Sequence, residues 1–204
     1  MYFTIKRLFD LFVSITGLII CIIPMGIIAL IIKLTSKGPV VYKHQRVGKH
    51  GKIFNVYKFR SMYDDNRSIE NILDESKLKQ FKEKHKVDDD PRITPFGRIL
   101  RKSSLDELPQ IFNIIKGDMA VIGPRPITSE ELEDYKENKD FLLKVRPGLT
   151  GYWTTHGRSQ IDNDIRIKME LYYVAKRSIS MDVKIFFKTF VKLSTNLCLI
   201  CPYI

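Results

Sequence analysis

Residues 11–32 read LFVSITGLIICIIPMGIIALII and contain no charged side chain. As a straight α-helix this stretch extends about 33 Å, which is enough to cross the hydrocarbon core of a bilayer. A secretory signal peptide has a shorter apolar region, followed by a cleavage site flanked by small residues, and the stretch fits neither feature. It therefore predicts a membrane helix near the N-terminal end of the fold.

The middle and the flanks of this segment decide between a helix that crosses the bilayer and one that re-enters it. Pro24 lacks an amide proton and clashes with the preceding turn, so a bend is expected there. Spanning helices also tolerate proline, so the flanks carry the argument. Basic residues on both sides favour the cytoplasm for both ends, which a helix that enters, bends and returns satisfies. We predict a proline-broken re-entrant membrane helix over residues 1–36, with Asp10 near the interface beside Arg7; the basic flanks are Lys6, Arg7, Lys33 and Lys37.

The charge of the chain is strongly positive and unevenly placed. Among 204 residues, 34 Lys and Arg stand against 23 Asp and Glu, which gives a net charge of +11. Between Asp10 and Asp64 there is no carboxylate. A basic block directly after an apolar segment favours an anionic lipid bilayer over nucleic acid as the partner, with a solvated basic face as the alternative. Its residues are Lys33, Lys37, Lys43, Arg46, Lys49, Lys52, Lys58 and Arg60.

A second membrane contact is predicted at residues 182–193, DVKIFFKTFVKL. Lys184, Lys188 and Lys192 recur every four positions, and aromatic and aliphatic residues fill most of the remaining helical surface. An amphipathic helix of this kind lies in the interface plane of a bilayer. A helix that covers a soluble core has the same pattern, and the sequence leaves both interpretations open.

The rest of the chain predicts an α+β fold, mostly helical, with one β-hairpin. Residues 40–47 and 52–62 are rich in β-branched and aromatic side chains and flank a Gly-Lys-His-Gly turn, which is typical of a hairpin. No internal repeat or low-complexity linker divides residues 37–204, so they are expected to form one cytoplasmic domain. Other expected elements are a charged, partly helical insertion at 64–92, two helical pieces within 93–117, turns at 123–126 and 146–148, and a helix over 164–175.

The densest group of candidate functional residues is RKSSLDELPQ, residues 101–110. Pro109 belongs in the first turn of a helix, which makes Asp106 the expected N-cap and Glu107 the first helical residue. Ser104 and Glu107 offer a capping box as an alternative start. Both interpretations place two adjacent carboxylates at the positive end of a helix dipole. Helix capping alone also accounts for such a pair.

The basic residues around this pair indicate more than a helix cap. Mg²⁺ binds one or two carboxylates together with phosphate oxygens. The arginine side chain binds phosphate through two parallel hydrogen bonds. Two acids amid basic residues are therefore the set that a diphosphate and a divalent metal require. The basic residues are Lys58 and Arg60 at the end of the hairpin, Arg98 and Arg101 before the pair, and Arg125 in the Gly-Pro-Arg-Pro turn.

Four further stretches carry a family resemblance. They are KFRSM (58–62), DPRITPFGRILRKSSLDELPQIFNIIKGDMAVIGPRP (90–126), VRPGLTGYW (145–153) and YYVAKRSISMDVKIFFKT (172–189). In this order, after a proline-broken apolar segment, they resemble the bacterial sugar transferases called small monotopic phosphoglycosyl transferases. The chain departs from that family at Ile23, since the family often has serine before the proline of the bend. Relatives can carry additional transmembrane helices before this domain, and the chain resembles the minimal form.

The resemblance implies a transfer in two steps on the cytoplasmic face of the inner membrane. Asp106 would attack the β-phosphate of a uridine diphosphate (UDP) sugar, releasing uridine monophosphate (UMP) and leaving a covalent aspartyl phosphosugar. Polyprenyl (undecaprenyl) phosphate would then attack this intermediate. Mg²⁺ is the implied cofactor, with Asp106 close to the metal and Glu107 orienting the metal or the nucleophile, or assisting the lipid phosphate. The implied phosphate-binding residues are Lys58, Arg60, Arg101 and Arg125.

Two other functions stand beside this interpretation. A non-catalytic basic membrane adaptor explains the charge and the apolar elements but leaves the Asp-Glu pair unexplained. A membrane-tethered nucleic-acid binder has no helix-turn-helix, zinc or RNP-type pattern, so no nucleic-acid partner is expected. The acidic run Asp88-Asp89-Asp90 is interpreted as solvated charge rather than a cation site. Selectivity for the sugar is expected from residues 127–170, with His156, Arg158 and Gln160 as candidates.

Overall fold

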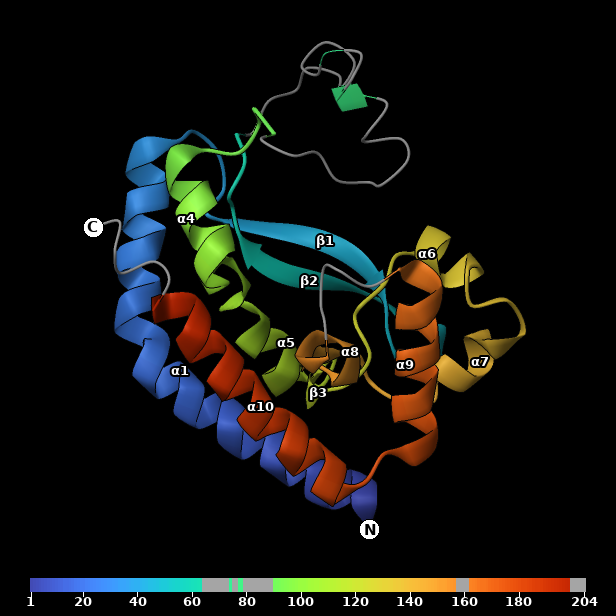
Figure 1. The fold of residues 1–204 in the computed structure, drawn as a ribbon. Coiled ribbons are helices and arrows are strands. Elements are labelled where there is room, and N and C mark those ends of the chain that lie inside the picture. The colour runs from blue at the N-terminus through green and yellow to red at the C-terminus, as the bar shows by residue number, and fades with distance from the viewer. Residues whose placement is uncertain (64–73, 75–76, 79–89, 157–161, 199–204) are drawn as a thin grey trace.

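The computed structural model describes residues 1–63, 74, 77–78, 90–156 and 162–198. Figure 1 shows α1 and α10 side by side along one edge of the molecule, with the hairpin, α5 and β3 behind them and α6, α7 and α9 at the other end. The predicted α+β fold is confirmed. The elements are α1 (Tyr2–Thr35), β1 (Val41–Val47), β2 (Ile53–Phe59), α4 (Pro95–Ser103), α5 (Gln110–Lys116), β3 (Ala120–Ile122), α6 (Ser129–Glu133), α7 (Lys139–Leu142), β4 (Gly148–Thr150), α8 (Tyr152–Thr155), α9 (Asn163–Lys176) and α10 (Ile179–Cys198), with 3₁₀ turns at η1 (Lys49–Gly51), η2 (Leu105–Glu107) and η3 (Lys136–Asn138).

Helix α1 is a continuous helix of 34 residues with Pro24 inside it. Pro24 therefore does not interrupt the helix, and the ribbon changes direction between its two ends, as a helix with a bend does (Figure 1). Proline removes one hydrogen bond from the helix, and Met25, Ile28 and Ile32 are buried beyond it, so packing holds the second half in place. The opposite face of α1 is apolar and exposed. It is the one helix in the described part of the chain that is long and apolar enough to cross a membrane.

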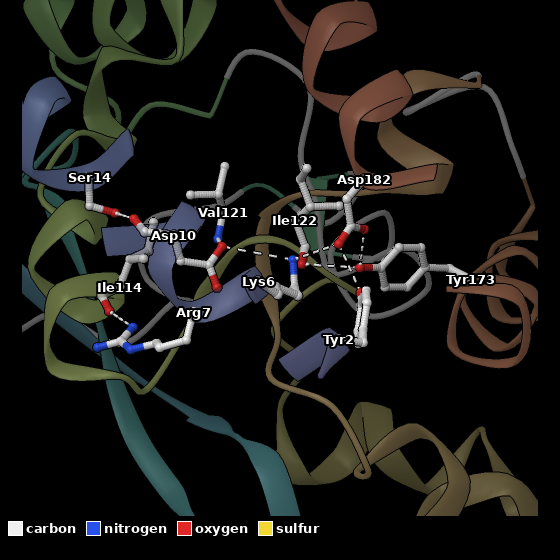
Figure 2. Close-up of polar contacts among 10 residues, drawn as sticks. All are labelled: Tyr2, Lys6, Arg7, Asp10, Ser14, Ile114, Val121, Ile122, Tyr173 and Asp182. Atoms are coloured by element: carbon white, nitrogen blue, oxygen red, sulfur yellow. Dashed lines mark hydrogen bonds and ion pairs between the residues drawn. The ribbon is translucent and has the colours of Figure 1, made fainter. Parts of the chain in front are cut away.

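The first turns of α1 are tied to the protein by a buried polar cluster (Figure 2). Asp10, which is only 1% exposed, accepts a hydrogen bond from the Val121 amide at 3.0 Å. Lys6 Nζ lies 3.1 Å from a carboxylate oxygen of Asp182 in α10. Arg7 donates to the carbonyl oxygens of residues 114 and 115 at the end of α5, at 2.6 and 2.8 Å. The sequence predicted Asp10 near the membrane interface; the structure buries its side chain inside the fold, where backbone groups bind both Asp10 and Arg7.

The other end of α1 is also bound to the protein. Met25, Ile28 and Ile32 form a core cluster with Phe59 of β2 and Leu100 of α4. The buried Arg60 guanidinium donates to the Ser36 carbonyl and hydroxyl oxygens at 2.8 Å, one residue beyond the end of the helix. Both ends of α1 are therefore attached to the same folded unit.

The hairpin forms where the sequence predicts it. Strands β1 and β2 pair antiparallel, with Val47 opposite Ile53 at the turn and Val41 opposite Phe59 at the open end. The sequence did not reveal the short parallel pair β3–β4. The chain passes so close at the start of β4 that a Cβ on Gly148 would lie 2.1 Å from the Gly123 amide nitrogen, a distance that excludes any side chain. This contact explains the glycines in the two predicted turns, Gly123 before Pro124 and Gly148 after Pro147.

The predicted helices of the C-terminal half are confirmed with small shifts of their ends. Two helices, α4 and α5, occupy residues 93–117, and Gly117 ends α5 in the left-handed region at φ 90°. Helix α9 covers the predicted 164–175 segment. The insertion predicted at 64–92 lies almost entirely outside the described residues, and its last acid, Asp90, pairs with Arg92 at 2.6 Å. Asp88 and Asp89 lie outside the described residues.

Helix α10 combines the two interpretations that its sequence left open. Asp182 and Ile185 are buried, and the Phe186 ring meets the Phe9 ring of α1 edge to face at 5.4 Å, so one face covers the core. Val183, Phe187 and Val191 lie four residues apart and are exposed, with Phe187 at 63%. The helix thus presents an apolar stripe on the outside while it packs against α1. Such a stripe fits a lipid surface better than water.

Candidate active site

The Asp-Glu pair does not cap a helix. Ser104 ends α4 in the left-handed region at φ 59°, and Asp106 and Glu107 follow in the 3₁₀ turn η2. Helix α5 begins only at Gln110, with Pro109 as its N-cap residue. Neither predicted cap forms: Asp106 lies inside η2, and Ser104, although it stands at the N-cap position of η2, makes no side-chain cap hydrogen bond. The two carboxylates are thus presented from a short 3₁₀ turn that follows a left-handed residue, with Leu105 between that residue and the pair.

Asp106 is held in a dehydrated position beside basic residues. Asp106 is only 8% exposed. Burial raises the pKa of the Asp106 carboxyl group, and Glu107 adds to this rise, while the charges of Lys58 and Arg101 act to lower the pKa. A poorly hydrated carboxylate is a stronger nucleophile than one in water, and the two cations favour its ionised form.

The residues next to Asp106 hold one another in place. Lys58 Nζ lies 2.8 Å from Glu107 Oε1, an ion pair that joins β2 to η2. Arg101 Nε donates to the Ser61 hydroxyl at 2.8 Å. The turn η2, through Glu107, and the helix before it, through Arg101, are thus both bonded to the end of the hairpin and the residues just after it. The predicted proximity of Lys58, Arg101 and the acid pair agrees with these contacts.

A cavity of about 210 Å³ opens beside this group. It brings together three of the predicted residues, Lys58, Glu107 and Arg125. Arg60 is not among the residues that line it, since its guanidinium binds the end of α1 instead. The structure thus assigns Arg60 a structural contact where the sequence predicted phosphate binding. The lining residues are His44, Arg46, Val56, Lys58, Glu107, Gln110, Gly123, Arg125, Pro126, Gly148, Leu149, Thr150, Gly151, Trp153 and Thr154.

The sequence analysis missed a second group of charged residues in this cavity. Arg46 Nη1 lies 2.7 Å from Glu131 Oε2, and Arg125 Nη2 lies 3.6 Å from Glu131 Oε1. Glu131 is fixed by a capping box at the start of α6, in which its carboxylate accepts from the Thr128 amide at 2.9 Å. The Thr-x-x-Glu pattern of residues 128–131 is a sequence signal for this cap. Nothing in the sequence pairs it with Arg46, which is 85 residues away.

Of the three candidates for sugar selectivity, the structure describes only His156. His156 is exposed and stacks on Tyr152 with ring centroids 4.2 Å apart, and its Nδ1 lies 2.7 Å from the Tyr152 carbonyl oxygen. It does not line the cavity. Arg158 and Gln160 lie outside the described residues.

Comparison with known proteins assigns the chain to a family. The model of the family described as "Bacterial sugar transferase" matches residues 1–196. The chain belongs to the bacterial sugar transferases. This bacterial sugar transferase is 46% identical, over 91% of its length, to the undecaprenyl-phosphate galactose phosphotransferase of Salmonella typhimurium strain LT2. It is 38% identical, over 90% of its length, to the exopolysaccharide production protein ExoY of Sinorhizobium fredii.

The two relatives differ in how much of them this sugar transferase covers. The chain spans 39% of the Salmonella protein but 83% of ExoY. A third relative, the undecaprenyl-phosphate glucose phosphotransferase of Komagataeibacter xylinus, is 36% identical over 90% of the chain, which spans 35% of that protein. All three matches extend over about nine tenths of the chain.

The acid pair fits the ligand requirements of Mg²⁺. Among the residues that the structure describes, no three His, Cys, Asp or Glu side chains gather as a metal cluster. Magnesium needs only one or two carboxylates when substrate phosphate supplies the other oxygens. Asp106 and Glu107 are adjacent, and Glu107 lines the cavity, so the pair meets this smaller requirement.

Proposed function

We propose that this sugar transferase moves a sugar phosphate from a UDP-sugar to undecaprenyl phosphate through a covalent intermediate on Asp106. The observation that carries the proposal is the buried carboxylate of Asp106 beside Lys58 and Arg101, next to Glu107, which together with Lys58 lines a cavity with further arginines. The names of the relatives, which include undecaprenyl-phosphate galactose and glucose phosphotransferases, support the acceptor and the reaction type.

The chain's own residues account for the steps as follows. A carboxylate oxygen of Asp106 attacks the β-phosphorus of the UDP-sugar, and the bond from that phosphorus to the bridging oxygen breaks. The electron pair leaves with UMP. An oxygen of the lipid phosphate then attacks the same phosphorus, the bond to Asp106 breaks, and the carboxylate is restored. Lys58 and Arg101 lie where they lower the cost of negative charge on the transferred phosphoryl group.

Magnesium is part of this proposal as the resident cofactor. When bound, Mg²⁺ neutralises charge on phosphate oxygens and holds them in position. Asp106 and Glu107 would hold it. Glu107 also holds Lys58 at 2.8 Å, so this residue orients the cation that lies next to the nucleophile.

We also propose that the protein is monotopic, with its active site on the cytoplasmic face of the inner membrane. A helix of 34 residues extends about 50 Å, more than a bilayer core requires. Yet Arg7 near its start and Ser36 after its end are both bound to the same folded unit. A crossing would place these two ends on opposite sides. The attachment of both ends supports a helix that dips into one leaflet with its exposed apolar face.

The substitution Asp106→Asn tests the proposed function, because it keeps the size of the side chain and removes the nucleophile. Purified protein in detergent with Mg²⁺ should release UMP from the right member of a panel of UDP-sugars without any lipid acceptor. Mass spectrometry should find the phosphosugar on the peptide that contains Asp106. The Asn variant should lose at least about 10³-fold in rate, equivalent to about 4 kcal/mol of barrier. Full activity in this variant would refute the proposal.

The adaptor hypothesis predicts the opposite pattern. Vesicles containing anionic lipid would bind the protein without metal or nucleotide, and none of the UDP-sugars would be turned over. Under our proposal Asp106→Asn still binds such vesicles, because α1 and the stripe on α10 are unchanged. Binding and turnover measured on the same preparation therefore separate the two functions.

A further inference from the structure

Two groups of charged residues contribute side chains to the cavity wall, Lys58 and Glu107 from one and Arg46 and Arg125 from the other, and the charges of the two groups do not balance equally. In the first group, Lys58 and Arg101 face the carboxylates of Asp106 and Glu107, so the opposite charges are equal in number. In the second group, Arg46 and Arg125 lie beside Glu131, and Arg166 and the buried Glu170 act on the same residues. Three arginines there face two carboxylates, so one positive charge is in excess, and it belongs to the group that does not contain the nucleophile.

The hairpin places the second group on the same surface as Lys58. In the β1–β2 register Lys58 is opposite Tyr42, and Val56 is opposite His44. Alternate residues of a strand share a face, so Tyr42, His44 and Arg46 follow one another on the face that carries Lys58. Two residues along a strand cover about 7 Å. The cavity thus has a row of basic and polar groups that leads away from the acid pair.

The hydrogen-bond partners of His44 define its protonation. Arg46 Nη2 lies 3.2 Å from His44 Nδ1, and a guanidinium group only donates. Nδ1 must therefore accept, which leaves the proton on Nε2. Burial lowers the pKa of His44, and the charges of Arg46 and Lys58 lower it further, in agreement with a neutral ring. His44 can then donate one hydrogen bond to an oxygen of a ligand in the cavity.

Arg46 and Arg125 differ in how firmly they are held. Arg46 has a 2.7 Å contact to Glu131 and a second contact to His44, so its guanidinium is fixed. Arg125 is anchored through its backbone, because its amide donates to the buried Glu170 at 3.2 Å, while its side chain is 38% exposed and lies 3.6 Å from Glu131. Burial raises the pKa of Glu131, but Arg125, the Thr128 amide and Arg46 outweigh burial and lower it overall, so this carboxylate is ionised.

We infer that Arg46, Arg125 and His44 form the binding site for the α-phosphate of the donor, the phosphate that departs with UMP. The inference rests on the proposed function and deepens it. When Asp106 attacks the β-phosphorus, the bond to the bridging oxygen breaks and its electron pair passes to the α-phosphate, which gains one negative charge. The excess positive charge of this group stabilises that gain. The same group gives free UMP its affinity for the enzyme.

Binding of UMP and of uridine to the full-length chain tests this inference without any turnover. Isothermal titration in detergent with magnesium chloride measures both ligands against Arg46→Gln, Arg125→Gln and His44→Phe. A lost charge-assisted hydrogen bond weakens binding by about 10- to 100-fold, so both arginine variants should weaken UMP by that factor. His44→Phe, which removes a neutral donor, should weaken UMP by about 2- to 12-fold. Uridine, which has no phosphate, should bind every variant as it binds the wild type.

The matched control is Lys43→Gln, which removes one positive charge from the same strand at an exposed position on its other face. It should bind UMP like the wild type. Arg125→Gln keeps the test decisive if Arg46→Gln fails to fold, because the Arg125 side chain is the less buried of the two. Unchanged UMP binding in Arg125→Gln, or equal loss of UMP and uridine, would overturn the inference. The proposed function would survive that result, since it stands or falls with Asp106→Asn.

Discussion

The contact between α1 and α10 provides the most quantitative prediction. Asp182 is 5% exposed and accepts from three donors in the cluster of Figure 2. They are the Tyr2 hydroxyl at 2.8 Å, Lys6 Nζ at 3.1 Å and the Tyr173 hydroxyl at 2.8 Å. The substitution Asp182→Ala removes all three acceptor contacts at once. It should therefore loosen the attachment of the membrane helix to the folded domain.

The size of the effect follows from which donors keep a partner. Tyr173 retains the Ile122 carbonyl oxygen at 3.3 Å, and Lys6 retains Asp10 at 3.8 Å. Tyr2 loses its Asp182 contact, and the buried ion pair with Lys6 is broken on one side. Breaking one side of such a pair costs about 3–5 kcal/mol. At this chain length each kcal/mol lowers Tm by about 2–4 °C, so Tm should fall by about 6–20 °C.

Thermal unfolding in detergent micelles, followed by circular dichroism, measures this change. Asp182→Asn is the conservative variant: it keeps the shape and one acceptor oxygen, so its cost should be about 1–3 kcal/mol. Asp140→Ala makes the same truncation at an exposed residue and should leave Tm within about 2 °C. If Asp182→Ala also stayed within that range, the cluster would not hold α1, and our account of its attachment would be wrong.

Two further predictions concern the active site and the close contact between Gly148 and Gly123. Asp106→Asn should raise Tm at pH 7, because a buried carboxyl group whose pKa is raised loses its stabilising contribution as pH rises through that pKa. The gain in Tm should vanish near pH 3, where the acid is protonated in both the folded and the unfolded protein. A series of melts at different pH values measures this, and a gain in Tm that stayed constant with pH would contradict it. Gly148→Ala should destabilise by about 1–3 kcal/mol or more, since its Cβ would meet the Gly123 amide nitrogen at 2.1 Å. Gly26→Ala in α1 is the matched control, because a Cβ there meets nothing within 4 Å, and it should be neutral or stabilise the protein by up to about 1 kcal/mol. Equal Tm values for the two variants would count against the close contact between Gly148 and Gly123.

Local sequence patterns were enough to place the elements that depend on neighbours along the chain. The uncharged run of residues 11–32, the hairpin turn at 48–51 and the helix end at Gly117 all follow from hydrophobic runs, β-branched residues and glycine. The position of the acid pair between basic residues was also visible. Its local conformation was not, because Ser104 adopts a left-handed conformation that serine rarely favours and no sequence pattern announces.

Which charged side chains meet depends on the fold. Arg60 and Arg46 looked alike in the sequence, as members of one basic block. Arg60 binds the end of α1, because the Ser36 carbonyl oxygen lies beside it beyond the last helical residue. Arg46 reaches the cavity, because the bridge from Val47 to Ile127 brings Glu131 to its strand. Both outcomes depend on the free backbone groups and carboxylates that folding places beside a side chain, and those partners lie 24 to 85 residues away along the chain.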